Sequence, residues 1–294
     1  MPATLTSILI VAADSGPPLR ECVVRALASS VAVELIVVDN ASRDGVPQAL
    51  ARANEHDERL RVIYNRANIG FGPAVNVGAR LARGDTLLIL NPDCLLEKDT
   101  LARMLDVLHT KPDAGVVGAV VCDAGGTPDP ASRRRDPLLR RSLNAMSGRA
   151  KREGENARYE GIDVPGPIPQ EPIEVENVSG ALMLLRRAVF ERLHGFDDRY
   201  FLHCEDLDLC RRVRDAGYKV LLAGSVRVLH AKGGSSAHRP VFVSYHKHRG
   251  MWRWFRKFDP VAHKPAMRAL VACGIASHFI ATAPLLWLRR RRHP

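Results

Sequence analysis

The feature that most constrains the fold is an apolar run that stops abruptly, Thr86-Leu-Leu-Ile-Leu-Asn-Pro-Asp93. A short apolar run bounded by turn residues is typical of a central parallel strand that is covered on both faces. Pro92 cannot donate to a sheet and disfavours helical backbone at Asn91, so the strand must end there. Asp93 is then expected just past the carboxyl end of a central strand, where open α/β sheets bind ligands. The simplest alternative is that Asp93 only caps the helix predicted at residues 97–109.

Strands and helices alternate through the first half of the chain. Strands are predicted at residues 7–13, 34–39, 60–64, 86–90 and 114–121, and helices at 17–29, 45–54, 73–81 and 97–109. This alternation indicates βαβ units and therefore an α/β, Rossmann-like fold with a mostly parallel central sheet flanked by helices.

Residues 123–176 break the pattern and are called the insertion below. They contain seven prolines and two arginine runs and show little periodicity. Segments of this kind inside compact domains are usually lids or mobile loops, so we predict a long flexible insertion. Regular structure is predicted to resume with a strand at 178–185, a helix from the acidic cluster at 205–208 to residue 216, and strands at 219–222 and 226–230.

Composition narrows the compartment and the partners. The six cysteines form no C-x-x-C pair, which favours reduced thiols and argues against a structural zinc site. The first residues lack a basic segment, so no signal peptide is expected. The net charge is +11, and residues 246–294 contain eleven Lys and Arg against one acid. Because this charge flanks an apolar segment, a membrane surface is the expected partner, and nucleic acid is not.

That apolar segment covers residues 269–288, between Arg268 and the run Arg289-Arg-Arg-Arg292. About twenty uncharged residues suffice to span a bilayer. The segment also contains Gly, Ser, His, Thr and Pro, so a single span, an interfacial or re-entrant helix and a buried core helix all remain open. We divide the chain into an α/β domain at 1–258 and a basic, apolar, helical tail at 259–294 that is expected to associate with a membrane.

Six short motifs follow one another in an order that identifies a family. They are Asp39-Asn40-Ala-Ser42, Asn65-Arg-Ala-Asn68-Ile-Gly70-Phe-Gly72 continuing to Asn76 and Gly78, Asn91-Pro92-Asp93, Ser179-Gly180-Ala181, the stretch from Gly195 to Asp208, and His230 with its following glycines. Together they resemble the inverting, nucleotide-sugar-dependent glycosyltransferases of family 2, which have the GT-A fold. The resemblance covers residues 6–257, and within the family the chain is most similar to bacterial rhamnosyltransferases.

The resemblance implies a metal site and a donor site. Asp93 would be the carboxylate ligand of a shortened D-x-D motif, with Asn91 in place of its first acid. His230, followed by Gly233-Gly234-Ser235, would be a second ligand or a diphosphate contact. The cofactor would be Mg²⁺ or Mn²⁺, since hard cations held by oxygen ligands neutralise a leaving diphosphate.

The donor is expected to lie beside the ends of the first two strands. Asp39 would accept a hydrogen bond from the nucleobase imide, unless it is only a turn residue. Asn68 and Asn76 would hold the loop that lines the base and ribose or contact the donor directly, and Gly70 allows close backbone approach. Ala13 departs from the family, because it stands where an aromatic residue commonly stacks on the base.

Inversion requires a base for the acceptor hydroxyl. By resemblance Asp206 is that base, with Glu205 beside it and with Gly180 and Asp208 on the acceptor side. The resemblance also implies that the insertion at 123–176 lies near the acceptor side. Acids at a helix start can also serve only the helix dipole. Carboxylates this close raise one another's pKa, however, which suits a base.

We therefore predict an inverting glycosyltransferase on the cytoplasmic face of the bacterial inner membrane. It would transfer L-rhamnose from dTDP-rhamnose to a lipid-linked or growing cell-surface glycan. One alternative is a UDP-hexose or UDP-N-acetylhexosamine transferase of the same fold. Another is a catalytically silent, membrane-associated scaffold subunit, which the altered Ala13 would fit.

Overall fold

The computed structural model describes residues 5–230 and 239–292. The strands are β1 (Thr6–Ala12), β2 (Val33–Asp39), β3 (Leu60–Tyr64), β4 (Thr86–Leu90), β5 (Cys94–Leu95), β6 (Ala114–Cys122), β7 (Ile173–Glu174), β8 (Leu182–Arg186) and β9 (Lys219–His230). The helices are α1 (Pro18–Leu27), α2 (Val46–Ala53), α3 (Phe71–Leu81), α4 (Thr100–Thr110), α5 (Leu139–Met146), α6 (Arg187–Arg192), α7 (Glu205–Asp215), α8 (Pro240–Phe258) and α9 (Pro265–Arg292).

The strands form one mixed sheet in the order β3-β2-β1-β4-β8-β6-β9-β5, with β7 beside β9. The part built by β3, β2, β1 and β4 is parallel, as the βαβ pattern predicts. The other part is mixed, because β8 runs antiparallel to both β4 and β6. The predicted mostly parallel arrangement therefore holds for the first half of the sheet.

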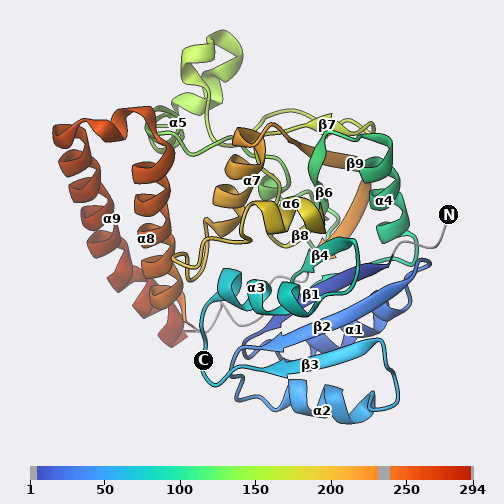
Figure 1. Cartoon of the computed structure of the whole chain (residues 1–294). Coiled ribbons are helices and arrows are strands. Elements are labelled where there is room, and N and C mark those ends of the chain that lie inside the picture. Colours follow the sequence, from blue (N-terminus) through green and yellow to red (C-terminus); the bar gives the residue numbers. More distant parts are fainter. Residues whose placement is uncertain (1–4, 231–238, 293–294) are drawn as a thin grey trace.

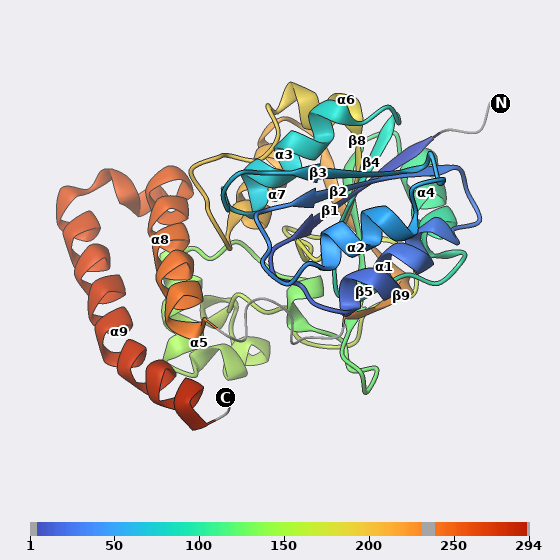
Figure 2. The ribbon, with the colours of Figure 1, turned by 90° about the horizontal axis from the view of Figure 1, so that it is seen from below.

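Helices cover both faces of the sheet (Figures 1 and 2). Apolar side chains of α1, α2 and α4 pack against one face, and those of α3, α6 and α7 pack against the other. All residues of β4 are buried, which confirms its central place.

Several element boundaries differ from the predictions; β8, for example, covers Leu182–Arg186 instead of residues 178–185. Residues 219–230 form the single strand β9, since a register shift against β6 after Ala119 carries the chain through the expected break. Helix α3 begins at Phe71 instead of residue 73, directly after Gly70 with its positive φ of 94°. Helix α4 begins at Thr100 with Asp99 as its N-cap residue, so Asp93 does not cap it.

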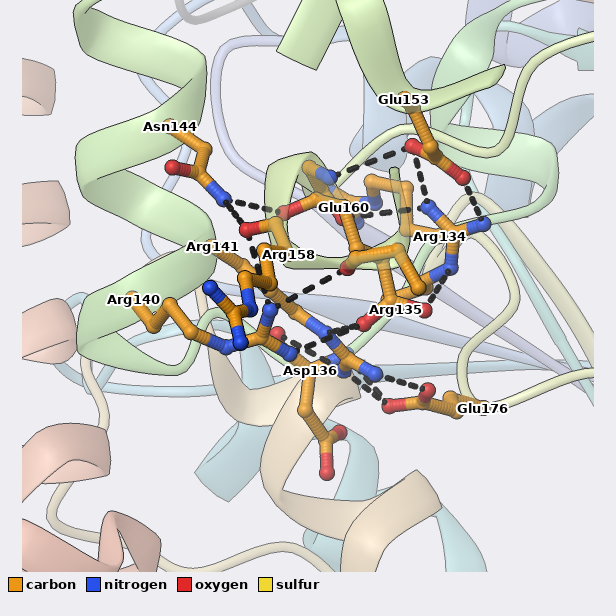
Figure 3. A network of polar contacts seen from close by, with 12 residues as sticks. Arg134, Arg135, Asp136, Arg140, Arg141, Asn144, Glu153, Arg158, Glu160 and Glu176 are labelled. Carbon is orange, nitrogen blue, oxygen red and sulfur yellow. Dashed lines mark hydrogen bonds and ion pairs between the residues drawn. The ribbon is translucent and has the colours of Figure 1, made fainter. Parts of the chain in front are cut away.

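The insertion contains α5, β7 and short 3₁₀ turns, and ion pairs connect its parts. Arg135 contacts Glu153 and Glu160, while Arg141 contacts Glu160 and Glu176 (Figure 3). These partners are partly buried, where ion pairs contribute more than at an open surface. The predicted flexibility of the insertion stays a prediction, and the structure supplies the contacts that would oppose it.

Helices α8 and α9 lie side by side next to the sheet domain (Figures 1 and 2). Trp254 of α8 is fully buried against Tyr200, Cys204 and Leu207, which fixes α8 on the segment that leads into α7. In α9, the stretch Pro265–Leu288 is long enough to cross a membrane and reaches a mean hydropathy of 1.8, yet none of it is buried. The open alternative of a buried core helix does not agree with this exposure.

Candidate active site

Two predicted metal residues meet at the end of the sheet. After β4, Asn91-Pro92-Asp93 turns the chain into β5, which pairs antiparallel with the last residues of β9. Cys94 lies opposite His230 in this pairing, so Asp93 comes alongside the imidazole. The His230 Nε2 atom lies 3.0 Å from an Asp93 carboxylate oxygen.

The chemistry of these side chains fits a divalent cation. The Nδ1 atom of His230 is buried without a hydrogen-bond partner among the described residues, and a ligand atom of Cys94 lies within 4.8 Å of those of Asp93 and His230. Burial and the nearby Asp93 charge raise the pKa of the Cys94 thiol well above its usual value, so the thiol stays protonated and is a weak ligand. A carboxylate and an imidazole remain as donors, and phosphate oxygens can complete such a shell. The predicted contacts of Gly233, Gly234 and Ser235 fall outside the described residues.

The predicted base lies in the first turn of α7. The Asp206 carboxylate accepts hydrogen bonds from the Arg134 guanidinium at 3.2 Å, from the Gly180 N–H at 3.2 Å and from its neighbour Leu207 N–H at 2.9 Å. A side chain at position 180 would place its Cβ 3.0 Å from the Asp206 Cβ, so glycine permits this approach. The residues directly before the helix, His203 and Cys204, both have positive φ, a strained backbone of the kind that clusters at functional sites.

A short backbone connection joins the two halves of the site. The Asn91 N–H donates to the Ala181 carbonyl at 2.9 Å, and the adjacent Gly180 N–H donates to Asp206. The turn that carries Asp93 and the helix that carries Asp206 therefore meet at residues 180–181. Asn91 takes part in this connection through its backbone N–H, and the predicted role of its side chain stays a prediction.

Glu205 is buried beside Asp206, and one of its carboxylate oxygens has no hydrogen-bond partner among the described residues. Burial, reinforced by the Asp206 charge, raises the pKa of Glu205 to about 8. Glu205 is therefore protonated at neutral pH, while its neighbour accepts three hydrogen bonds. Two adjacent carboxyl groups in such different environments are typical of acid–base sites.

Replacement of Glu205 tests this electrostatic assignment. The unfolded chain releases the Glu205 proton near pH 4.5 and the folded chain near pH 8, so wild-type stability should fall as pH rises between these values and level off above them. Glu205→Gln keeps the neutral shape and should be more stable than wild type above about pH 8, by a few kcal/mol. Thermal melts across this interval measure the effect, and parallel pH profiles for the two proteins would contradict it.

Arg134 is a site residue that the sequence analysis missed. It belongs to the arginine run 133–135, in which Arg133 binds backbone carbonyls of the insertion and Arg135 binds acids within it. Backbone pairing of Arg134 with Asn177 turns its own side chain toward Asp206. The run itself was visible in the sequence, but nothing in it distinguished the middle arginine.

The Asp208 carboxylate is engaged by two cations of the fold. Its side chain is fully buried and paired with Arg212 of α7 and Lys257 of α8. These ion pairs give Asp208 a structural role, joining α7 to α8, and its predicted place on the acceptor side stays a prediction.

On the donor side, the chain places Asp39 and Ala13 at neighbouring strand ends. Asp39 is buried, and its carboxylate accepts hydrogen bonds from the Ser42 N–H at 2.9 Å and from Gln48 at 3.3 Å. The Ala13 N–H donates to Ser15, and the methyl group of Ala13 offers no ring for stacking. The turn interpretation of Asp39 is therefore correct locally, and its contact with a nucleobase stays a prediction.

The loop before α3 is organised by Asn40, which the sequence analysis treated only as a turn residue. Its amide nitrogen donates to Asn68 and to the Gly70 carbonyl, and its amide oxygen accepts from Asn65 and from the Ile69 N–H. Asn68 also accepts from the Gly70 N–H. Asn68 thus holds the loop, which was one of the two predicted roles.

Asn76 and Gly70 attach this loop region to the segment that precedes the base. The Asn76 amide exchanges hydrogen bonds with both backbone groups of Phe196 and donates to Asp198. A Cβ at position 70 would lie 2.6 Å from the Phe201 carbonyl oxygen, so only glycine fits there. These two residues position the loop. The Asn76 amide already bonds to Phe196 and Asp198, so it has little capacity for a direct donor contact.

Comparisons with known proteins identify the family. The model of the family described as "Glycosyl transferase family 2" matches residues 7–193. The N-acetylglucosaminyl-diphospho-decaprenol L-rhamnosyltransferase of Mycobacterium tuberculosis is 31% identical over 85% of this chain and 88% of its own length. The rhamnosyltransferase WbbL of Escherichia coli is 26% identical over 67% of this chain and 83% of its own.

Solved structures share the fold. A Pyrobaculum calidifontis mannosyltransferase in complex with GDP-Man and Mn²⁺ superposes with a TM-score of 0.61 at 20% identity, covering 98% of this chain and 75% of its own. GalNAc-T7 with UDP, GalNAc and Mn²⁺ gives a TM-score of 0.64 at 16% identity, over 87% and 48% of the two chains.

Proposed function

As a member of glycosyltransferase family 2, this chain is a nucleotide-sugar-dependent glycosyltransferase of cell-envelope polysaccharide synthesis, and we propose that it transfers L-rhamnose from dTDP-rhamnose, with inversion, to a lipid-linked glycan. The observation that carries the proposal is the meeting of the Asp93 turn and the Asp206 helix at residues 180–181. The rhamnosyltransferase names of two relatives support the donor sugar, and the name of the mycobacterial relative supports the acceptor class.

In this proposal Asp206 removes the proton of the acceptor hydroxyl. The hydroxyl oxygen forms a bond to the anomeric carbon from the face opposite the nucleotide, while the bond from that carbon to the diphosphate oxygen breaks. Arg134 and the Gly180 N–H hold the carboxylate in one orientation during this step. The proton ends on Asp206, and the bonding electrons leave with the nucleoside diphosphate.

Asp93 and His230 are the residues that would hold a divalent cation, Mg²⁺ or Mn²⁺. When bound, such a cation supplies positive charge to the departing diphosphate. Asp39 and the loop organised by Asn40 would then receive the nucleobase and ribose. Without an aromatic residue at Ala13, that binding depends on hydrogen bonds more than on stacking.

A donor panel tests the proposal. Transfer or hydrolysis with dTDP- and UDP-sugars, each with Mg²⁺ or Mn²⁺, should be fastest with dTDP-rhamnose, and NMR of the product should show the inverted anomeric configuration. Faster reaction with a UDP-hexose or UDP-N-acetylhexosamine would replace the proposed donor. Absence of turnover with every donor would favour the scaffold alternative.

We also propose that α9 holds the enzyme at the cytoplasmic face of the inner membrane. Large apolar side chains of α9 are exposed, among them Leu270, Ile280 and Leu285. The basic run after Leu288 would add attraction to anionic lipid, about 1 kcal/mol for each Lys or Arg close to the surface. An enzyme held there searches for a lipid-linked acceptor in two dimensions.

Deletion of α9 tests this placement. A chain ending at Lys264 should move from the membrane fraction to the soluble fraction and still hydrolyse donor, because Asp39, Asp93, Asp206 and His230 lie upstream. Transfer to membrane-borne acceptor should fall far more than transfer to a water-soluble acceptor. A full-length protein that is soluble and monomeric without detergent, or a deletion that unfolds the domain, would contradict the proposal.

A further inference from the structure

A basic cavity lies against the segment that leads to the base. Its volume is about 290 Å³, and it opens between the loop at residues 198–201 and one face of α8. The α8 residues that line it are His246, Arg249, Gly250 and Arg253, which share a helix face because they recur at intervals of three and four.

Two guanidinium groups of this cavity have no carboxylate partner among the described residues, those of Arg249 and Arg253. Arg253 lies over the buried ring of Tyr200, with 5.7 Å from its guanidinium carbon to the ring centroid, which orients its side chain. Arg199, by contrast, is bound twice by Asp197. Asp198 is the acid among the lining residues, and its carboxylate accepts a hydrogen bond from Asn76 at 2.7 Å. The cavity lining therefore holds three arginines against one carboxylate and is positively charged overall.

The segment at residues 198–205 lines the cavity at its start and leads into the helix that carries the base. A Cβ at Gly250 would lie 2.8 Å from the His203 carbonyl oxygen, so α8 packs directly on the backbone ahead of Asp206. Phe201 of this stretch stacks on His246, with ring centroids 4.3 Å apart. Residues 201–205 thus connect the cavity lining to the catalytic carboxylate along the chain.

Phosphate esters are the chemistry that matches this lining, since arginine binds phosphate oxygens through paired N–H groups. Resting on the proposed function, we propose that this cavity binds the diphosphate of the lipid-linked acceptor. In the acceptor that the mycobacterial relative's name gives, a single N-acetylglucosaminyl group separates the diphosphate from the reacting hydroxyl. An acceptor of this kind would need a diphosphate site close to the base. Exposed Phe242 and Tyr245, on the same helix toward its N-terminus, then lie where the lipid chain leaves.

Charge-removing variants test this site. Arg249→Gln and Arg253→Gln, alone and combined, should raise KM for a diphosphate-linked lipid acceptor about tenfold or more for each arginine lost, relative to KM for an uncharged alkyl glycoside of the same sugar. Arg249→Lys keeps the positive charge, so it should raise KM for the diphosphate-linked acceptor less than Arg249→Gln does. Arg256→Gln is the matched control, because Arg256 lies on the same helix against Trp252 and outside the cavity. An equal rise in KM for both acceptors, or an equal effect of Arg256→Gln, would overturn the proposal.

A binding experiment separates this inference from the proposed activity. Calorimetry with farnesyl diphosphate, which carries no sugar, should show binding to wild type that the double variant loses, even if no donor supports turnover. Binding to phosphatidylglycerol vesicles distinguishes the diphosphate of an acceptor from the phosphate of a lipid headgroup. If the double variant loses vesicle binding but keeps farnesyl diphosphate binding, the cavity recognises lipid headgroups and the acceptor assignment is wrong.

Discussion

Asp93→Ala should reduce sugar transfer by about 10³-fold or more, because the departing diphosphate would lose the charge that this carboxylate holds in place. Asp93 pairs with His230 at the end of the sheet, and no neighbouring carboxylate is placed to substitute for it among the residues that surround the pair in the described structure. The same variant should bind donor with little dependence on Mn²⁺. Initial rates and calorimetry with and without Mn²⁺ measure both effects.

Asp113→Ala is a suitable control, since Asp113 is an exposed carboxylate paired with Lys219 at the opposite end of β6 and β9. It should retain wild-type rates. His230→Ala should resemble Asp93→Ala in its lost metal dependence. Full activity of Asp93→Ala, or of wild type in excess chelator, would rule out the metal role.

Asp206→Asn should lower kcat by about two to four orders of magnitude, the usual worth of general-base catalysis, and should change donor affinity little. Asparagine retains the size and an acceptor oxygen, so the contacts from Arg134 and Gly180 can persist while the base is lost. Single-turnover rates and donor binding measured on the same protein separate chemistry from affinity.

Glu205→Gln is the matched comparison, because it removes the adjacent acid and keeps its shape. Since burial holds Glu205 protonated at neutral pH, this variant should lose much less activity than Asp206→Asn near pH 7. If Glu205→Gln proves the more damaging change, Glu205 is the base and the assignments are exchanged.

The elements that place Asp39 and Asp93 could be predicted from the sequence. Both acids follow short apolar runs, and such runs become buried strands whose ends are marked by turn residues. The position of these acids at the carboxyl edge of a parallel sheet then follows from βαβ connectivity. The contact between Asp93 and His230 could not be predicted physically, because it depends on the pairing of β5 with β9, far away in the chain.

Polar residues outside the strand ends were harder to assign. The amide of Asn76 and the carboxylate of Asp208 could each bind a substrate. Only the folded structure shows that Phe196 already bonds to the amide and that Lys257 already pairs with the carboxylate. Arg134 shows the converse. It looked like one member of a solvated basic run, and its backbone pairing with Asn177 directs it to Asp206.

By itself the sequence determined the α/β class, the acids at the strand ends, the acidic turn that opens α7 and the apolar character of α9, because hydrophobic period and turn chemistry are local properties. The tertiary structure alone decided that Arg134 reaches Asp206, that Lys257 pairs with Asp208 and that α8 lines a basic cavity. A side chain's role depends on whether its hydrogen bonds and charge are satisfied within the fold or left open to a ligand. That balance is set by residues distant in the chain, which only folding brings together.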